Sequence, residues 1–447
     1  MRTIRTGGAS ALLLAAHACA CAQSTEQPMQ QVVVKSGVHE ARAQSTTTAI
    51  VVGRDELLRQ GDTSLADVLK RQPGITLDAS PGKAPTIRMR GMGGGYVAIL
   101  LNGLPAPSGF SLESISPDLI ERIEVLRVAS AEFSAESMAG TINIVLRKAA
   151  RKRQRSAKLG YLAASDFRGP NFNAELGDRG ERSSYAFTAS GNHDTLDREA
   201  YGVEENRAPG GSVDLLRTTV VPERGHTNRF NLAPRFNWTL DNGDTIAWES
   251  MGNGTSFRNH AQPLITTLAG PAPQVPDLQT FGEMDDRMIK SDLRWNRKTA
   301  SGLEFDLKFG AEWSSRKMFV KRLGFDAGGR LETDGSTLTD THARGVNTTG
   351  KATHAAGGGH LLALGWDVRV DDSDDIRVER DRVRVLPPGV LDERFRAQAS
   401  RAAVYLQDEW TLGPQWSVYL GTRLEGVRTR VLGNSFAPAR VTSSVLS

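Results

Sequence analysis

Two short stretches of this 447-residue sequence have residue types that bind phosphate or metal ions. GMGGGY (91–96) has the glycines of a phosphate-binding loop, but Tyr96 replaces the last glycine of G-x-G-x-x-G and no helix follows. VDDSDD (370–375) has carboxylates suited to calcium, without the glycine and glutamate spacing of an EF-hand loop. We therefore expect a flexible or tight turn at 91–96 and a solvated loop at 370–375.

The remaining polar residues do not form a catalytic or metal-binding pattern. The seven histidines after residue 22 are scattered, without metal spacing, and no nucleophile–base–acid set stands out. A basic run would indicate nucleic acid in a cytosolic protein, but here it joins two segments of different composition, so we expect a solvated face. Its members are Arg147, Lys148, Arg151, Lys152, Arg153 and Arg155. The sequence predicts no enzyme, no cofactor, no metal site and no nucleic-acid partner.

The first 22 residues have the pattern of a secretory signal peptide. Arg2 and Arg5 precede a short apolar run and an A-x-A site, and we expect cleavage after Ala22. The alternative is a short N-terminal core helix. Both cysteines, Cys19 and Cys21, lie in this segment, so the mature chain would depend on neither disulfides nor thiolates. Without the segment, 53 basic residues face 51 acidic ones, and this net charge of +2 does not indicate nucleic acid.

Residues 23–48 are polar and rich in Gln, Ser and Thr, which predicts a flexible tail. Within it, Val32, Val33 and Val34 have high strand propensity and no local partner. Such a run could add to the sheet edge of a partner protein, or it could be the first strand of the next domain.

Residues 49–150 have the pattern of a small α/β domain. TAIVVGRDELLRQ predicts a strand followed by a helix, and TSLADVLKRQPGI predicts a helix with Ser64 as N-cap and Pro73-Gly74 as its end. PTIRMRG and YVAILLNG predict strands around a glycine-rich turn. SPDLIERIEVLRV predicts a helical turn leading into a strand, and AGTINIVLRK a further strand.

Residues 151–447 alternate between apolar and polar side chains over long segments. In LEFDLKFGAEW (303–313), Leu303, Phe305 and Leu307 lie on one face of a strand, and Glu304, Asp306 and Lys308 on the other. Tight turns recur at Gly180, Gly243, Gly302, Gly358 and Gly413. Polar segments at 193–226, 254–286 and 371–399 separate the hairpins, and we expect them to be long loops.

Short turns at one end, long loops at the other and an exported N-terminus favour a transmembrane barrel over a soluble β-sandwich. The mean hydropathy of −0.35 does not suggest a helical membrane protein. Several tryptophans near predicted strand ends would fit interfacial girdles, namely Trp248, Trp313, Trp366, Trp410 and Trp416. An exported chain of this kind is expected in a bacterial outer membrane.

Three sequence blocks resemble, in their order, the plug of TonB-dependent outer-membrane receptors. They are TIRMRGMGGGYVAILLNGLPAP (86–107), SPDLIERIEVLRV (116–128) and AGTINIVLRK (139–148). QVVVKSG (31–37) is similar to the family's TonB box. The family's Gly-Pro turn after the second block is missing, which marks a divergent subfamily. The resemblance implies an α+β plug domain followed by an antiparallel transmembrane β-barrel, with about 11–12 of the family's 22 strands in this chain.

The resemblance also implies a role for individual residues. Val32, Val33 and Val34 would pair with TonB by strand addition. A plug latch would pair charged plug residues with the barrel wall, and its members are Arg90, Glu121, Arg122, Glu124 and Arg127. A plug apex would face the substrate, and its members are Met92, Gly93, Gly94, Gly95 and Tyr96.

The function implied is energised import by a monomer in outer-membrane lipid, most simply of a ferric siderophore. Haem, cobalamin or oligosaccharide uptake is the alternative, and a passive porin and an exported hydrolase or adhesin are functions of other classes. The chain ends in VTSSVLS without a terminal aromatic residue, and about 11–12 strands make too narrow a barrel to enclose a plug. We therefore expect an N-terminal portion of a receptor, which could also be a non-functional truncated one.

Overall fold

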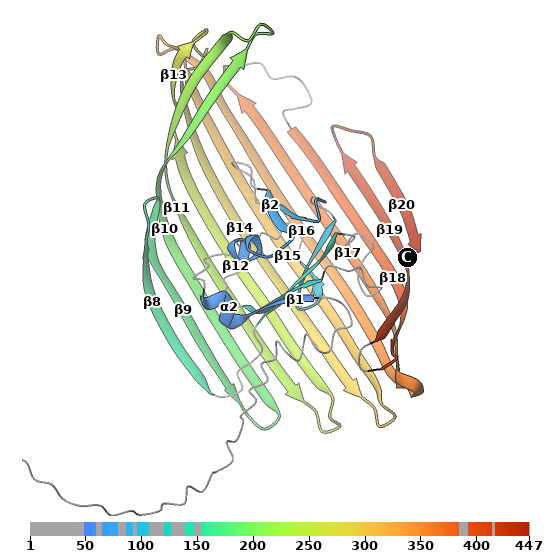
Figure 1. Cartoon of the computed structure of the whole chain (residues 1–447). Helices are drawn as coiled ribbons and strands as arrows, with labels where there is room; N and C mark the ends of the chain where they lie inside the picture. The colour runs from blue at the N-terminus through green and yellow to red at the C-terminus, as the bar shows by residue number, and fades with distance from the viewer. Residues whose placement is uncertain are drawn as a thin grey trace, which may run out of the picture.

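The computed structural model describes residues 49–59, 65–78, 86–92, 96–106, 120–126, 139–146, 153–383, 392–413 and 416–446. The predicted signal peptide, the TonB box and the Ser64 cap lie outside these residues. The described part contains a small α/β unit and one large curved sheet (Figure 1).

The α/β unit contains the two predicted helices and the five predicted strands, together with β2 and β5, which were not predicted, while the helical turn predicted before β6 lies outside the described residues. Its strands are β1 (Ala49–Gly53), β2 (Ile75–Asp78), β3 (Thr86–Met89), β4 (Val97–Leu101), β5 (Leu104–Pro105), β6 (Ile120–Leu126) and β7 (Gly140–Leu146). The helices are α2 (Arg54–Arg59) and α3 (Leu65–Lys70). Five strands form one sheet in the order β1-β6-β7-β4-β5, and β2 and β3 form a hairpin.

A single apolar cluster holds this unit together. The helix α3 buries Leu65, Val68 and Leu69, as its spacing predicts, in the same apolar cluster as Ile123 of β6 and Ile142 of β7. The strand β7 is buried along almost its whole length, since it lies in the centre of the five-stranded sheet. This cluster extends beyond the α/β unit to Ala233, Met251 and Met288 of the large sheet.

The large sheet is antiparallel throughout, and each strand pairs with its neighbour in sequence except around β13. Its strands are β8 (Gln154–Ala163), β9 (Phe167–Arg179), β10 (Ser183–Arg207), β11 (Val213–Thr239), β12 (Thr245–Ala261), β13 (Leu264–Ala269), β14 (Asp277–Lys298), β15 (Leu303–Phe325), β16 (Leu331–Ala356), β17 (His360–Asp381), β18 (Asp392–Thr411), β19 (Ser417–Gly433) and β20 (Ala439–Leu446). A short 3-10 turn, η4 (Gly357–Gly359), joins β16 to β17. Twelve of these strands are successive neighbours, and β13 pairs with β11 and β14.

The strands run much further than the sequence predicted. The polar segments 193–226, 254–286 and 371–399, expected to be loops, are largely strand: β10 and β11 pair as far as Arg207 and Val213, and β17 continues through 370–375 to Asp381. The prediction was wrong because it required apolar alternation. A strand with water on both faces keeps its backbone ladder without that alternation.

The two faces of the strands differ as predicted. Within β15, Phe309 and Trp313 are 54% and 40% exposed on the convex face, whereas Glu312 on the concave face is 7% exposed. Charged side chains are therefore buried on the concave side and large apolar side chains are exposed on the convex side. This is the reverse of a soluble sheet and is the pattern of a wall with lipid outside.

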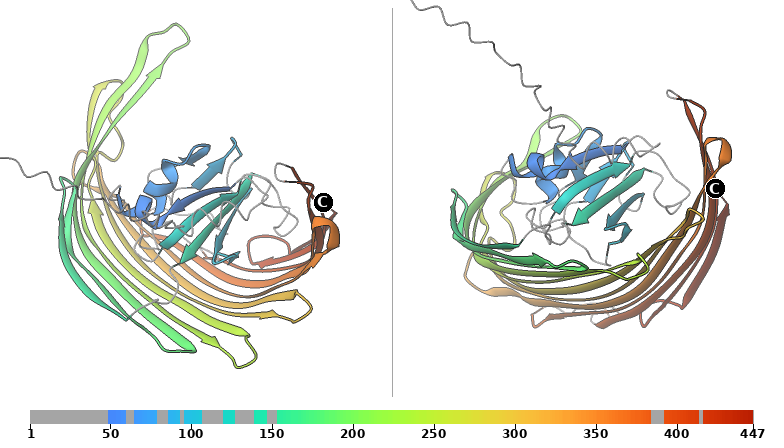
Figure 2. Two further views of the ribbon diagram at one scale, coloured as in Figure 1. Left: turned by 60° about the horizontal axis from the view of Figure 1, so that its bottom comes forward. Right: turned by 90° about the horizontal axis from the view of Figure 1, so that it is seen from below.

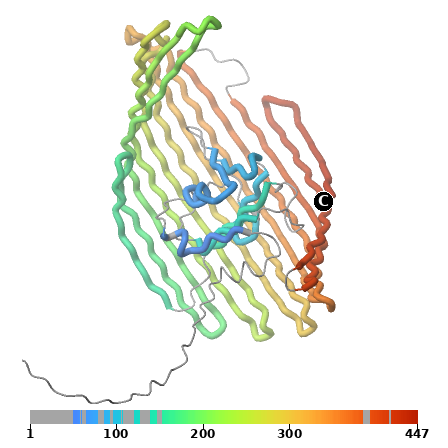
Figure 3. Tube along the Cα trace, viewed as in Figure 1, coloured from blue at the N-terminus to red at the C-terminus, as the bar shows by residue number. Residues whose placement is uncertain are grey.

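The sheet curves around the α/β unit, which lies on its concave side (Figure 2). The tilted strands meet in tight turns at one end, while β10 and β11 project beyond the other end (Figure 3). Trp313 and Trp366, predicted near strand ends, lie within β15 and β17, because these strands are longer than expected. Among the described residues, no helix is both long and apolar enough to cross a membrane.

Candidate functional site

The candidate site is the interface between the α/β unit and the concave face of the large sheet. It is built around the β4–β5 turn, whose sequence, Leu-Asn-Gly-Leu, is a strong signal for a two-residue hairpin. Asn102 and Gly103 both have left-handed backbones, with φ of 53° and 78°. A Cβ atom at Gly103 would lie only 2.8 Å from Lys308 Nζ of β15, so glycine permits this close approach.

Asn102 connects the turn both to its own sheet and to the wall. Its Nδ2 donates to Glu249 of β12, and its Oδ1 accepts from the Leu146 amide at 2.8 Å. The Gly103 amide donates to Asn143 Oδ1 at 2.8 Å. Asn143 in turn donates to Glu124 Oε2 at 2.8 Å. A polar relay thus leads from β6 through β7 and the turn to the wall.

Arg369 of β17 makes the second polar contact across the interface. Its Nη1 donates to the Ala106 carbonyl oxygen at 3.3 Å, just after β5. The same guanidinium pairs with Glu312 at 2.9 Å and with Asp371 at 2.7 Å. Because two carboxylates neutralise and orient it, Arg369 can be buried while it holds a backbone carbonyl.

Further buried charges continue along the concave face. Asp367 accepts from Arg401 at 3.2 Å and from Arg423 at 3.1 Å, and Arg423, only 1% exposed, also pairs with Glu425 at 2.7 Å. These side chains come from three adjacent strands, β17, β18 and β19. The register that places them opposite one another therefore determines the network.

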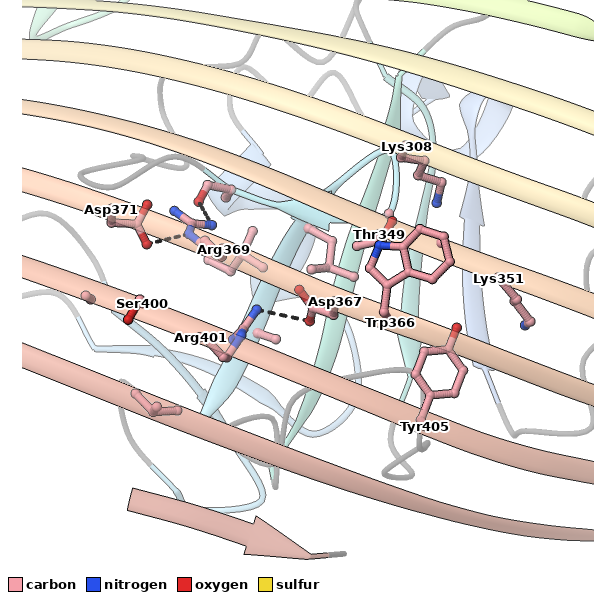
Figure 4. Close-up of a pocket in the computed structure, with 18 of the residues that line it drawn as sticks. Lys308, Thr349, Lys351, Trp366, Asp367, Arg369, Asp371, Ser400, Arg401 and Tyr405 are labelled. Carbon is pink, nitrogen blue, oxygen red and sulfur yellow. Dashed lines mark hydrogen bonds and ion pairs between the residues drawn. The ribbon is translucent and has the colours of Figure 1, made fainter. Parts of the chain in front are cut away.

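A cavity of about 300 Å³ lies between the β4–β5 hairpin and strands β15–β19 (Figure 4). Residues Ala98 to Leu100 of β4 form its apolar side. Its charged lining is Asp306, Lys308, Lys351, Asp367, Arg369, Asp371 and Arg401. On the opposite flank, Ala233, Met251 and Met288 pack tightly into the apolar cluster of the α/β unit. The apolar contacts of the interface thus lie on β11, β12 and β14, beside the Asn102–Glu249 hydrogen bond on β12, and the cavity with its charged lining lies toward β15–β19.

The structure brings two of the predicted latch residues together. Arg122 Nε lies 2.7 Å from Glu124 Oε1, but this pair lies within β6 of the α/β unit, and Glu124 connects to the wall only through the Asn143 relay. Glu121 is half-buried on the same strand, and Arg90 is exposed with a φ of 54° in the turn after β3. Arg127 lies outside the described residues. A latch role for these residues stays a prediction.

The predicted apex and box residues are described only in part. Met92 closes the β3 turn through two backbone hydrogen bonds with Met89 and packs against the apolar cluster, whereas Tyr96 is 46% exposed. Gly93, Gly94, Gly95 and the Val32–Val34 run lie outside the described residues. Their contacts with substrate or partner stay predictions.

The sequence analysis did not identify the residues that cross the interface, Asn102, Glu249 and Arg369. Two signals were present: the Asn-Gly pair after an apolar strand, and the charged positions that alternate with Val368 and Val370. Among the described residues, no group of three or more His, Cys, Asp or Glu side chains is arranged to hold a metal ion. The polar interface can exchange its hydrogen bonds for water, so it can separate at a small net free-energy cost.

Comparison with known families covers most of the chain. Residues 41–141 match the model of the TonB-dependent receptor plug domain, and residues 164–445 match the TonB dependent receptor-like β-barrel model. The iron-regulated outer membrane virulence protein of Vibrio cholerae is 27% identical over 93% of this chain and 57% of its own length. The vitamin B12 transporter BtuB of Vibrio vulnificus is 29% identical over 28% of this chain and 22% of its own length. The chain therefore spans little more than half the length of the first of these relatives.

Two solved structures resemble the chain more distantly. The alcaligin outer-membrane receptor FauA of Bordetella pertussis has a TM-score of 0.44 at 13% identity, covering 90% of this chain and 81% of its own. The pyoverdine receptor FpvA of Pseudomonas aeruginosa has a TM-score of 0.43 at 12% identity, covering 91% of this chain and 78% of its own. The family models match the α/β unit and the large sheet separately, as plug and barrel respectively.

Proposed function

The chain belongs to the TonB-dependent receptors, a family of receptors and transporters and not of enzymes, and from this premise we propose that it imports a scarce, bulky nutrient across the bacterial outer membrane. The observation that carries the proposal is a plug seated against a concave wall of buried charges, with exposed apolar side chains on the opposite face. A sheet with apolar side chains on its convex face and charged side chains on its concave face is suited to lipid outside and a polar passage inside.

The plug sheet suggests how a pull could be transmitted. Among the described strands, β1 is an edge strand that pairs only with β6, and it is the first described element after the predicted TonB box. The opposite edge of the sheet, β4–β5, carries the contacts of Asn102 and Ala106 with the wall. A pull on the N-terminal tail would peel β1 residue by residue, while the far edge stays attached to the barrel.

The cavity suggests where the passage opens. Toward β11, β12 and β14 the plug is fixed by apolar packing together with the hydrogen bond from Asn102 to Glu249, but toward β15–β19 it meets charged side chains and a cavity. Separation on the polar side exposes groups that water can solvate, and separation on the apolar side does not. We therefore expect the substrate to pass between the plug and strands β15–β19.

We propose an iron chelate, such as a ferric siderophore, as the substrate class. The support is the iron-regulated relative, which aligns with 93% of this chain. Cobalamin is the second candidate, supported by the shorter match to a vitamin B12 transporter. In both cases the proposed apex has two described members: Met92, which packs on the apolar cluster, and Tyr96, which is exposed after the glycine-rich turn.

The test of energised import is a proline in the proposed TonB box. We expect Val33→Pro to abolish uptake of a radiolabelled ferric siderophore in iron-limited cells, because proline cannot donate to a partner strand. Binding of the same chelate to whole cells on ice should be unchanged, since the box would face the periplasm.

Val33→Thr is the matched control, because threonine keeps both the N–H group and β-branching, and it should support normal uptake. Full uptake by Val33→Pro would contradict the box assignment. Uptake that persists after a protonophore would instead indicate a passive porin.

A further inference from the structure

The projecting part of β10 has an unpaired backbone edge. On one side β10 pairs with β11 along nearly its whole length, but on the other it pairs with β9 only from Ser184 to Leu196. The Asp197 amide donates to the Asp166 carbonyl oxygen at 2.9 Å, and among the described residues this is the last backbone hydrogen bond on the β9 side. The far side of β11 is covered by β13, whereas residues 198–207 of β10 stay uncovered at the end of the hairpin that projects beyond the barrel (Figure 1).

The direction of the free backbone groups follows from the last hydrogen bond on this side. Residues two apart on a strand point their N–H and C=O groups toward the same edge. Because Asp197 points its amide outward, every second residue after it does the same, up to the register shift that follows Asn206. Each of these residues presents one donor and one acceptor to a further strand. The outward residues are Glu199, Tyr201, Val203 and Glu205.

The side chains of the same four residues form one face of the edge, continuous with the convex face of the sheet. Tyr201 and Val203 lie at its centre and are 75% and 72% exposed, and Glu199 and Glu205 flank them. Residues 197–207 include four acidic and two basic residues, without the prolines or lysines that commonly block an edge. The edge is therefore open to pairing, apolar at its centre and acidic on both flanks.

The opposite face of the segment is already paired within the hairpin. Arg198 lies 2.6 Å from Glu223 of β11, and Arg217 of β11 lies 3.4 Å from Glu204. On the open face, by contrast, Glu199 accepts a hydrogen bond from a neutral hydroxyl group at 2.7 Å, so its charge is not neutralised by that contact. A partner would thus meet an acidic and apolar face.

We propose that this edge binds an extended segment of an external polypeptide as an added strand, with apolar residues opposite Tyr201 and Val203 and basic residues opposite Glu199 and Glu205. Main-chain hydrogen bonds at a sheet edge supply affinity, and alternate side chains supply specificity. Opposite charges and apolar pairs that face each other across two strands stabilise the pairing. Since Arg207 already pairs with Glu205, the basic residue opposite Glu199 should contribute more.

A second copy of the chain fits this edge less well. In one membrane, β10 of both copies runs in the same direction, so the two edges can meet only as parallel strands about a twofold axis along them. Such an axis places the convex face of one copy beside the concave face of the other. Tyr201 and Val203 would then not meet their counterparts and would stay exposed.

The test uses the full chain in detergent micelles and a fluorescein-labelled peptide of nine residues, in which threonine alternates with lysine, valine, valine and lysine. Binding is measured by fluorescence anisotropy. We expect saturable binding that Val203→Pro weakens about fivefold, since proline removes one outward donor and no hydrogen bond to β11. Tyr201→Ser with Val203→Ser should weaken binding about tenfold, because two apolar cross-strand pairs are lost.

The matched control is Leu264→Ser with Leu268→Ser, which removes side chains 57% and 62% exposed from β13 of the same projecting sheet. It should bind the peptide normally, and a peptide with glutamate in place of lysine should not bind. Unchanged binding by Val203→Pro in a chain that keeps its heat-modifiable migration, or an equal loss in the control, would overturn the proposal. A dimer that the peptide dissociates would make a second copy the occupant and would overturn the external one.

Intact cells distinguish this proposal from the membrane orientation on which it depends. Under the proposed function the tight turns face the periplasm, so the edge lies outside the cell and the labelled peptide should bind cells that carry the wild type. Binding in micelles without binding to intact cells would contradict this orientation. Absence of binding in micelles would overturn the strand-addition site alone.

Discussion

A single side chain, Asn102, joins the plug to the barrel wall in a way that can be tested by three substitutions. It adopts a φ of 53°, donates to Glu249 and accepts from the Leu146 amide. Asn102→Asp keeps the acceptor and tolerates this backbone, but it places a carboxylate against Glu249. We expect amide hydrogen exchange in β4 and β5 to become about tenfold faster, since a hydrogen bond to a charged group is lost.

Two control substitutions distinguish the loss of the side-chain hydrogen bonds from the effect of backbone strain. Asn102→Gly keeps the left-handed turn but loses both side-chain hydrogen bonds, whereas Asn102→Ala also introduces about 1 kcal/mol of backbone strain. Exchange in β1, at the other edge of the sheet, should be the same in all three variants. If Asn102→Asp left β4–β5 protection unchanged, the bond to Glu249 would not hold the plug.

The residues of this interface show why the site was harder to predict than the fold. The Asn-Gly turn can be read from the sequence, but Glu249 lies 147 residues away. Their contact depends on the height of the plug in the barrel. The latch residues Arg122 and Glu124 were predicted to pair with the barrel wall, but they pair with each other, because residues two apart on a strand share a face, and Glu124 connects to the wall only through Asn143.

At the scale of elements, the plug helices and strands were predicted well and the barrel strands only in part. Alternation of apolar and polar side chains, as in residues 303–313, predicted the part of each strand whose two faces meet different surroundings. Beyond that band both faces meet water, and the signal vanishes although pairing continues, as in β10 and β11. Strand length therefore exceeded the prediction wherever hairpins project beyond the expected bilayer.

The outer ends of β16, β17 and β18 should respond to acid. Hydrogen bonds from Arg396 and, next, from Arg344 hold the pKa of Asp372 well below its usual value of 3.8, and the side chain lies outside the membrane-spanning segment. Since the folded pKa is depressed, this carboxylate contributes stability above about pH 4 that is lost as the pH falls toward the folded pKa.

We therefore expect the unfolding midpoint of the wild type to exceed that of Asp372→Asn at pH 7, and the difference to shrink steadily below pH 4. Heat-modifiable migration on gels, measured after incubation at each pH, reports the folded fraction. A difference that stayed constant from pH 7 to pH 3 would show that the ionised carboxylate of Asp372 does not contribute.

At the scale of the whole molecule, plug and barrel are held by two unlike contacts. Apolar packing at Ala233, Met251 and Met288, together with the Asn102–Glu249 hydrogen bond on β12, makes the plug part of the barrel's own core, while the contact of Arg369 with Ala106 lies beside a cavity. The first contact resists separation and the second allows it. A plug attached in this way can move on one side without leaving the barrel.

Tryptophan fluorescence should report the barrel alone. All seven tryptophans lie between Trp238 and Trp416, and none lies in the plug elements from Ala49 to Leu146. Trp313 and Trp366 are 40% and 39% exposed on the convex face. In vesicles, brominated acyl chains should therefore quench most of the emission, because bromine would contact these rings directly, whereas aqueous iodide should quench little. Strong iodide quenching without bromine quenching would show that the apolar face does not meet lipid, and it would remove the basis for a transmembrane barrel.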